Sequence, residues 1–146
     1  MTDVQRVVDT FEIQALSVDF TDSSMMRDWD RFASLFAEDG AWRMPHIDVV
    51  LASRAEIREG IERLREGMWE FFVQNVHPGT ISLDGDTATG RAYIEEFGQF
   101  RDGKCLLNHA VYHDRYARTA DGWKFTERLY EIRYIDTNPL SGRPPS

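Results

Sequence analysis

The sequence is poor in several features that define large classes of proteins. Its single cysteine, Cys105, cannot form a disulfide within the chain, and no apolar run approaches the ~18 residues of a transmembrane helix. Basic residues are also few, because 17 Lys and Arg stand against 25 Asp and Glu for a net charge of −8. This balance argues against nucleic acid or an anionic membrane as a partner. The start of the chain also lacks the pattern of a signal peptide, so we expect a soluble, cytoplasmic protein.

The motifs that bind nucleotides, flavins or catalytic metals are missing as well. The chain has no glycine-rich dinucleotide or Walker loop, no nucleophile elbow and no metalloprotease motif. His109 and His113 lie four residues apart in a predicted strand, about 13 Å at ~3.3 Å per residue, which is too far to share one ion. We therefore expect no cofactor and no metal.

What the chain does contain is enough apolar material for one core. Of its 146 residues, 42% are hydrophobic and 12% are aromatic, which favours a single folded domain over residues 1–146 rather than a disordered chain. The segment 138–146 is rich in proline and glycine and is expected to form a tail.

The first part of the chain has the spacing of three helices. A stripe of apolar residues predicts an amphipathic helix that begins near Asp3 and ends in the cluster 21–24, with the stripe facing the core. The stripe consists of Val4, Val8, Phe11, Ala15 and Val18. A second helix is expected from Asp28 to Gly40, and Ser53 with Glu56 forms a capping box that predicts a third.

The second part of the chain has the character of long strands. After a short strand at 41–44, we expect strands at about 70–83 (interrupted at Pro78), 87–100, 105–118 and 123–135, separated by Asp-Gly turns. Such strands form a strongly curved antiparallel meander. The expected fold is therefore α+β, a curved antiparallel sheet wrapped around three N-terminal helices, with a pocket in its concavity.

Several local strings carry a resemblance to a known family. They are Asp28-Trp29-Asp30, the segment from Leu35 to Trp42, Asp84-Gly85-Asp86-Thr87-Ala88, Tyr112-His113-Asp114-Arg115-Tyr116, and Gly122-Trp123-Lys124-Phe125 before Arg128. In this order the chain resembles the SnoaL-like branch of the nuclear-transport-factor-2-like superfamily over nearly its whole length. The resemblance implies a cone-shaped fold with an apolar pocket, and a homodimer formed through the convex face of the sheet.

The resemblance also implies a set of site residues. The segment 76–80 resembles the pocket strand of hexachlorocyclohexane dehydrochlorinases, which makes His77 the expected base, and Arg128 falls on the arginine that serves the departing group. The family's orienting acid falls on Met25 and a second polar position falls on Phe20. The same two positions carry the acid and the tyrosine of scytalone-dehydratase-like and bile-acid-dehydratase-like relatives, so neither arrangement is intact here.

Other residues are candidates on positional grounds. Asp22 precedes Met25 by three residues and could replace the missing carboxylate. Tyr112 could supply a hydroxyl and Asp114 a carboxylate if their face of the strand is the concave one, whereas His109 becomes the candidate if it is not. Leu16, Phe20, Met25 and Trp42 are expected to shape a ligand pocket. Of the adjacent pair Glu95 and Glu96, one side chain points to each face of the sheet.

Three functions follow from these candidates. The first is a cofactor-independent lyase, isomerase or cyclase in which His77 removes a proton from carbon of a small hydrophobic substrate, assisted by Arg128 and Tyr112. The second is a protein that binds a small hydrophobic ligand, or a homodimeric accessory module, without catalysis. The third is hydrolysis through Glu95 or Glu96, Asp114 and Arg128.

Overall fold

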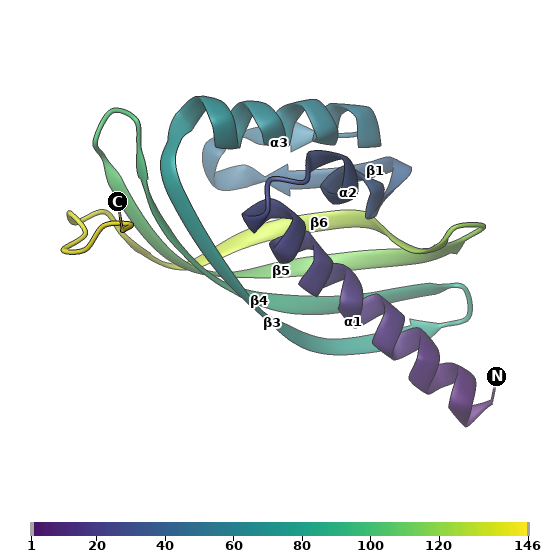
Figure 1. Ribbon diagram of the computed structural model, residues 1–146. Helices are drawn as coiled ribbons and strands as arrows, with labels where there is room; N and C mark the ends of the chain where they lie inside the picture. The colour runs from purple at the N-terminus through teal and green to yellow at the C-terminus, as the bar shows by residue number, and fades with distance from the viewer. Residues whose placement is uncertain (1, 146) are drawn as a thin grey trace.

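The computed structural model describes residues 2–145, which form three helices, a single 3-10 turn and one sheet (Figure 1). In chain order the elements are α1 (Asp3–Met25), α2 (Trp29–Ser34), β1 (Phe36–Met44), η1 (Pro45–Ile47), β2 (Val49–Leu51), α3 (Arg54–Met68), β3 (Trp69–Asp84), β4 (Thr87–Phe100), β5 (Cys105–Thr119) and β6 (Gly122–Asp136). Among these residues, no helix is both long and apolar enough to cross a membrane.

The sheet has the strand order β2-β1-β6-β5-β4-β3. The antiparallel meander predicted for the last four strands is confirmed. The sheet as a whole is mixed, however, because β1 pairs with β6 in parallel. That pairing joins segments about 90 residues apart, and neither strand carries a local signal that would show it.

The region between residues 28 and 51 differs from the sequence prediction. The side chain of Asp28 accepts a hydrogen bond from the Arg31 amide and caps α2 as expected, but α2 ends at Ser34 instead of continuing to Gly40. Residues 36–40 belong to β1, whose register shifts between Phe36 and Ala41. The short strand β2 was not predicted. In this stretch, pairing with β6 overrides a local pattern that also fits a helix.

Helix α1 is present, but the predicted stripe is not its buried face. Val4 and Phe11 are each 73% exposed, and Val8 and Val18 are also exposed. The buried face instead consists of Asp9, Ile13, Leu16, Ser17, Phe20, Thr21, Ser23 and Ser24. The prediction failed because it counted apolar residues only, whereas this face includes polar side chains that have partners on the sheet, such as Asp9 with Arg118.

The curvature of the sheet places all three helices on its concave side. Figure 1 shows α1 crossing this side diagonally, with its N-terminal end extending beyond the sheet, while α2 and α3 lie together over β1. Phe20 of α1 packs against Phe32 of α2 and Trp42 of β1, with ring centroids 4.4 and 5.8 Å apart. This aromatic cluster forms one wall of an unfilled space between α3 and β3 to β6.

Candidate functional site

The unfilled space is a cavity of about 460 Å³, lined by residues from every helix and strand. Most of its wall is apolar or aromatic. The lining residues Ile47, Met68 and Ile135 are each about half exposed and mark its open end. An apolar cavity of this size with a few polar groups is typical of a site for a small molecule.

The polar groups of the cavity gather on the inner face of the sheet. Glu96 of β4 is half-buried, and its two carboxylate oxygens accept hydrogen bonds from the Tyr130 hydroxyl and from the Gln74 side-chain amide, the latter at 3.0 Å. The Thr21 hydroxyl of α1 donates to the side-chain oxygen of Gln74, Oε1, at 2.7 Å, and Asn108 donates to the Tyr130 hydroxyl at 3.2 Å. Because a carboxylate offers about four lone-pair directions, Glu96 keeps acceptor capacity that these two donors do not use.

The tyrosine in this cluster is held in its protonated form. Burial, followed by the neighbouring Glu96 carboxylate, raises the pKa of the Tyr130 hydroxyl above its usual value of 10.0. Tyr130 also lies beside His46, with ring centroids 4.8 Å apart, and partial burial lowers the pKa of His46. The cluster therefore presents an acceptor and a donor side by side at the wall of an apolar cavity.

Arg65 enters the cavity wall from the opposite side, on α3. Its Nη1 donates to the Ser24 hydroxyl at 2.6 Å and to the Ser24 carbonyl at 3.1 Å, and its guanidinium lies 4.5 Å from the centre of the Phe72 ring. Only 7% of the residue is exposed. Burial lowers the pKa of Arg65 to about 10, which leaves the side chain charged at neutral pH.

Arg128 was expected to serve a departing group, but it lies behind the cavity wall. It is fully buried and forms an ion pair with Asp114, and the rings of Phe20, Tyr112 and Phe125 surround its guanidinium at 3.9 to 4.4 Å. Of these rings, Phe20 and Tyr112 line the cavity. Asp114 also accepts a hydrogen bond from Tyr116. The Asp114 carboxylate therefore neutralises Arg128 and is directed away from His77.

His77 lies outside the cavity. It is two-thirds exposed and its Nε2 is 3.7 Å from Glu95 Oε1. Its position follows from strand alternation: Gln74 faces the cavity, the register of β3 is regular from Phe71 to Pro78, and residue 77 therefore points to the convex face. The resemblance of segment 76–80 matched the sequence of a pocket strand, but here the histidine occupies the outward-facing position.

The structure also decides which face of β5 is concave. Asn108, Ala110, Tyr112 and Asp114 are buried on the concave side, while His109 and His113 lie on the convex side. Tyr112 lines the cavity as expected, and its hydroxyl accepts a hydrogen bond from Trp42 Nε1 at 3.0 Å. Burial raises the pKa of this hydroxyl well above 10.0.

The remaining expected residues divide into two groups. Phe20 and Trp42 line the cavity, whereas Leu16 is buried in the core and Met25 contacts the backbone amide of Gln74 through its sulfur at 3.4 Å. Asp22 is exposed and pairs with Arg31 at 2.9 Å. It therefore does not replace the acid that the family has at position 25.

Sequence reasoning did not single out the two charged residues of the cavity. Glu96 was one of two adjacent candidates, and only the tertiary structure shows which of them faces inward. Arg65 carried a usable signal: it follows Ile57 by eight residues and Ile61 by four, so it lies on the apolar face of α3. A charged residue at such a position is uncommon and marks a candidate site.

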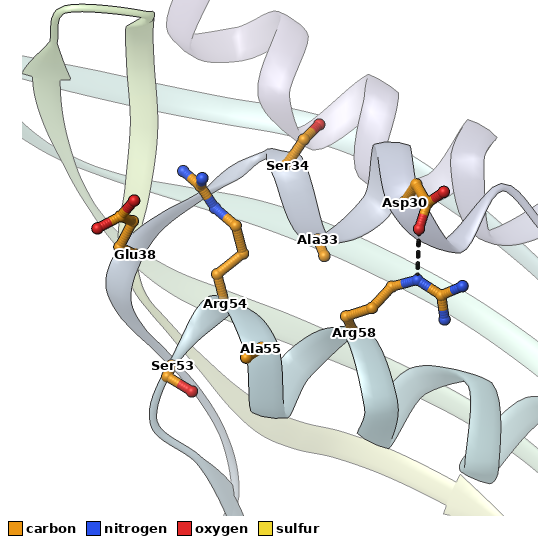
Figure 2. Close-up of a pocket in the computed structure, with 8 residues that line it drawn as sticks. All are labelled: Asp30, Ala33, Ser34, Glu38, Ser53, Arg54, Ala55 and Arg58. Carbon is orange, nitrogen blue, oxygen red and sulfur yellow. Dashed lines mark hydrogen bonds and ion pairs between the residues drawn. The ribbon is translucent and has the colours of Figure 1, made fainter.

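A second cavity of similar volume lies at the surface between α2, β1 and the start of α3. Figure 2 shows Arg58 of α3 reaching Asp30 of α2 in an ion pair. Arg58 also pairs with Glu62, and Arg54 donates to the Phe36 carbonyl. Since its arginines already have partners, this cavity offers less to a ligand than the interior one. Among residues 2–145, no group of three His, Cys, Asp or Glu side chains is arranged to hold a metal ion.

A curved sheet and three helices that together enclose an apolar cavity define a class of small α+β proteins. The SnoaL-like domain family matches residues 5–129, and the chain belongs to this family. The γ-hexachlorocyclohexane dehydrochlorinase of Sphingobium indicum is 26% identical over 97% of this chain and 90% of its own length.

Solved structures of dehydrochlorinases have the same fold. A type 2 hexachlorocyclohexane dehydrochlorinase superposes with a TM-score of 0.90 at 20% identity, over 99% of both chains. The type 3 enzyme of Novosphingobium barchaimii superposes with a TM-score of 0.86 at 22% identity, over 99% of this chain and all of the other. These similarities confirm the predicted cone-shaped fold.

Proposed function

We propose that the interior cavity is an active site in which Glu96 removes a proton from carbon of a small, mainly hydrophobic substrate without a cofactor. The observation that carries this proposal is the Glu96 carboxylate, half-buried at the wall of an apolar cavity and held by Gln74 and Tyr130. A general base must be fixed within hydrogen-bond reach of the substrate and screened from bulk water. Base-catalysed eliminations and isomerisations begin with this step.

Tyr130 supplies the complementary group. Its hydroxyl stays protonated at neutral pH and lies against Glu96, so it can return a proton to the product or stabilise negative charge as it develops. The dehydrochlorinase relatives support this class of reaction, since a dehydrochlorinase, as its name states, eliminates hydrogen chloride. The sequence suggested His77 as the base. Because His77 lies on the outer face of the sheet, we assign the role of base to Glu96 instead.

The test is proton exchange at carbon. The protein is incubated in D₂O with a panel of small cyclic ketones and γ-hexachlorocyclohexane, and nuclear magnetic resonance follows deuterium incorporation while an electrode follows chloride release. Glu96→Gln is expected to reduce the rate by about 10²-fold or more. Glu95→Gln is the matched control, because it makes the same change one residue away on the opposite face, and it should leave the rate unchanged.

Two outcomes would contradict the proposal. If Glu96→Gln retains the wild-type rate, Glu96 is not the base. If compounds raise the melting temperature of the wild-type protein but none is exchanged or converted, the cavity binds ligands without catalysis. That second outcome would support the non-catalytic binding protein that the sequence also allowed.

A further inference from the structure

Arg65 is a buried cation without an anionic partner. The other buried arginine, Arg128, pairs with Asp114, whereas within residues 2–145 no carboxylate oxygen lies within 4.0 Å of Arg65. Its helix neighbour Glu66 pairs with Arg27 instead. Burying a charge without a counterion is costly, so the Arg65 charge requires compensation from another source.

The contacts of Arg65 use one part of the guanidinium and leave another free. Nη1 is held by Ser24, and the rings of Phe72 and Trp29 lie 4.5 and 5.6 Å from the guanidinium carbon. Nε is buried and has no hydrogen-bond partner. In the described part of the chain, Nη2 donates no side-chain hydrogen bond either. Nε is covered by neighbouring protein atoms, whereas Nη2 keeps accessible surface, so Nη2 is the nitrogen through which Arg65 can bind a ligand.

Guanidinium N–H groups bind carboxylate oxygens strongly, and Arg128 of this protein provides an example. Arg128 binds Asp114 through Nε and Nη2 at 2.8 and 3.0 Å, one carboxylate oxygen on each nitrogen. Two parallel N–H groups match a carboxylate in this way. In Arg65 only Nη2 is open to such an interaction, and it has no carboxylate partner in the wall of the apolar cavity.

We propose that the interior cavity binds small hydrophobic molecules that carry one carboxylate group, and that Arg65 receives this group through Nη2 while the apolar part lies along the sheet wall. This deepens the proposed function, on which it rests for treating the ligand as a substrate: Arg65 holds the substrate and Glu96 acts on it. The apolar lining accounts for the rest of the ligand, since the wall outside the polar cluster and Arg65 is formed mainly by aromatic and aliphatic side chains.

The charge of Glu96 makes the proposal specific. Glu96 lines the same cavity. Burial, and then Arg27, lower the pKa of Arg65, and the Glu96 charge offsets a part of this lowering, so the two groups attract each other across the space. A bound carboxylate would be attracted by Arg65 and repelled by Glu96. Removal of the Glu96 charge should therefore tighten carboxylate binding, although it abolishes the proposed chemistry.

Calorimetric titration with matched ligand pairs tests the inference. The probes are 2-naphthoate and cyclohexanecarboxylate, each compared with its primary amide, which has the same shape and no charge. The wild-type protein is expected to bind each carboxylate at least tenfold more tightly than its amide. Arg65→Met should abolish this preference and change the affinity for the amide by less than about threefold. Arg63→Met, an exposed arginine on the same helix, is the control and should retain the preference.

A second variant keeps the test decisive if Arg65→Met does not fold. Arg65→Lys keeps the charge but replaces the planar guanidinium with a compact ammonium group, and it should retain only part of the preference for the carboxylate. The inference is overturned if the wild-type protein binds acid and amide equally, if it binds neither carboxylate at millimolar concentration, or if the Arg65 variants keep the full preference.

The test of carboxylate binding by Arg65 can be distinguished from the test of catalysis by Glu96. Glu96→Gln should bind the carboxylates more tightly than the wild-type protein and yet fail to exchange protons. Carboxylate preference without proton exchange in the wild-type protein would leave Arg65 as a ligand-binding residue and remove Glu96 as a base. Proton exchange on neutral substrates without a preference for carboxylates would support Glu96 as the base and would overturn the carboxylate-binding role of Arg65.

Discussion

Arg128 and Asp114 form a fully buried, two-point ion pair that joins β6 to β5, with nitrogen to oxygen distances of 2.8 and 3.0 Å. Neither side chain has exposed surface. Tyr116 and Ser17 complete its surroundings, the latter at 3.5 Å from Arg128 Nη2. The pair lies behind Phe20 and Tyr112, so it supports the cavity wall.

Removal of one partner should therefore destabilise the fold. Asp114→Asn leaves the Arg128 charge buried without a counterion, and we expect a loss of about 3–5 kcal/mol in the free energy of unfolding. Urea denaturation measures this value. Asp121→Asn, a change of the same kind in an exposed turn, should be close to neutral, and an equal effect of the two substitutions would contradict the structural role.

A second ion pair gives a prediction about pH. The pKa of Asp9 falls from 3.8 to about 2, chiefly because Arg118 donates two hydrogen bonds to its carboxylate, at 3.0 and 2.8 Å. The unfolded chain takes up this proton more readily than the folded one. The stabilisation is therefore complete above the ordinary pKa and is lost as the pH falls from about 4 towards 2.

Asp9→Asn should remove this part of the pH dependence. The variant is expected to unfold at a lower temperature than the wild-type protein at neutral pH, and the difference should shrink towards pH 2. Asp86→Asn is the control, because Asp86 binds the same Arg118 from an exposed position and should have a smaller effect. A difference between Asp9→Asn and wild type that stays constant from pH 6 to 2 would contradict the assignment.

The location of His77 predicts that it can be replaced without loss of function. Since it lies on the convex face beside Glu95, His77→Ala should change neither proton exchange nor ligand affinity by more than about twofold. The same assays as for Glu96→Gln provide the measurement. A tenfold or larger loss would restore His77 as a candidate base and would require a different conformation of β3.

Gly98 shows how closely β3 and β4 pack beside the cavity. A Cβ atom at this position would lie 2.4 Å from the Phe71 carbonyl oxygen and 2.8 Å from the Trp69 ring. Gly98→Ala should therefore destabilise the protein, whereas Gly67→Ala in α3 meets no atom within 4 Å and should stabilise it by about 0.5–1 kcal/mol. Thermal unfolding of both variants tests this contrast, and a stabilising Gly98→Ala would show that the strands can move apart.

The homodimer expected through the convex face stays a prediction. That face carries the partly exposed Val73, Tyr93 and Phe97. Light scattering should give twice the chain mass of 17.0 kDa, and a monomer at micromolar concentration would contradict the prediction. Lys, Glu or Asp substitutions at Tyr93 should then favour the monomer by placing charge in the interface.

Much of the fold could be predicted because its signals are local. Ser53 accepts a hydrogen bond from the Glu56 amide, and Glu56 accepts one from the Ala52 amide, so the capping box at the start of α3 depends on residues only a few positions apart. The strand pairs of β3 to β6 were likewise bounded by Asp-Gly turns at 84–85, 102–103 and 121–122. The order of these elements, together with the family strings, was sufficient to predict the cone.

The site depended on relationships that no local pattern carries. Alternation along a strand shows that Glu95 and Glu96 face opposite sides, but which side holds the cavity depends on where the three helices pack. In α1, apolar spacing favoured the stripe of Val4 and Phe11, whereas the position of Arg118 on the sheet determined that the face with Asp9 is buried. Arg65 and Glu96 come from a helix and a strand far apart in sequence and meet only across the cavity. The sequence alone thus determined the elements and their order, whereas tertiary packing decided which charged groups face inward, because burial is a property of the assembled layers.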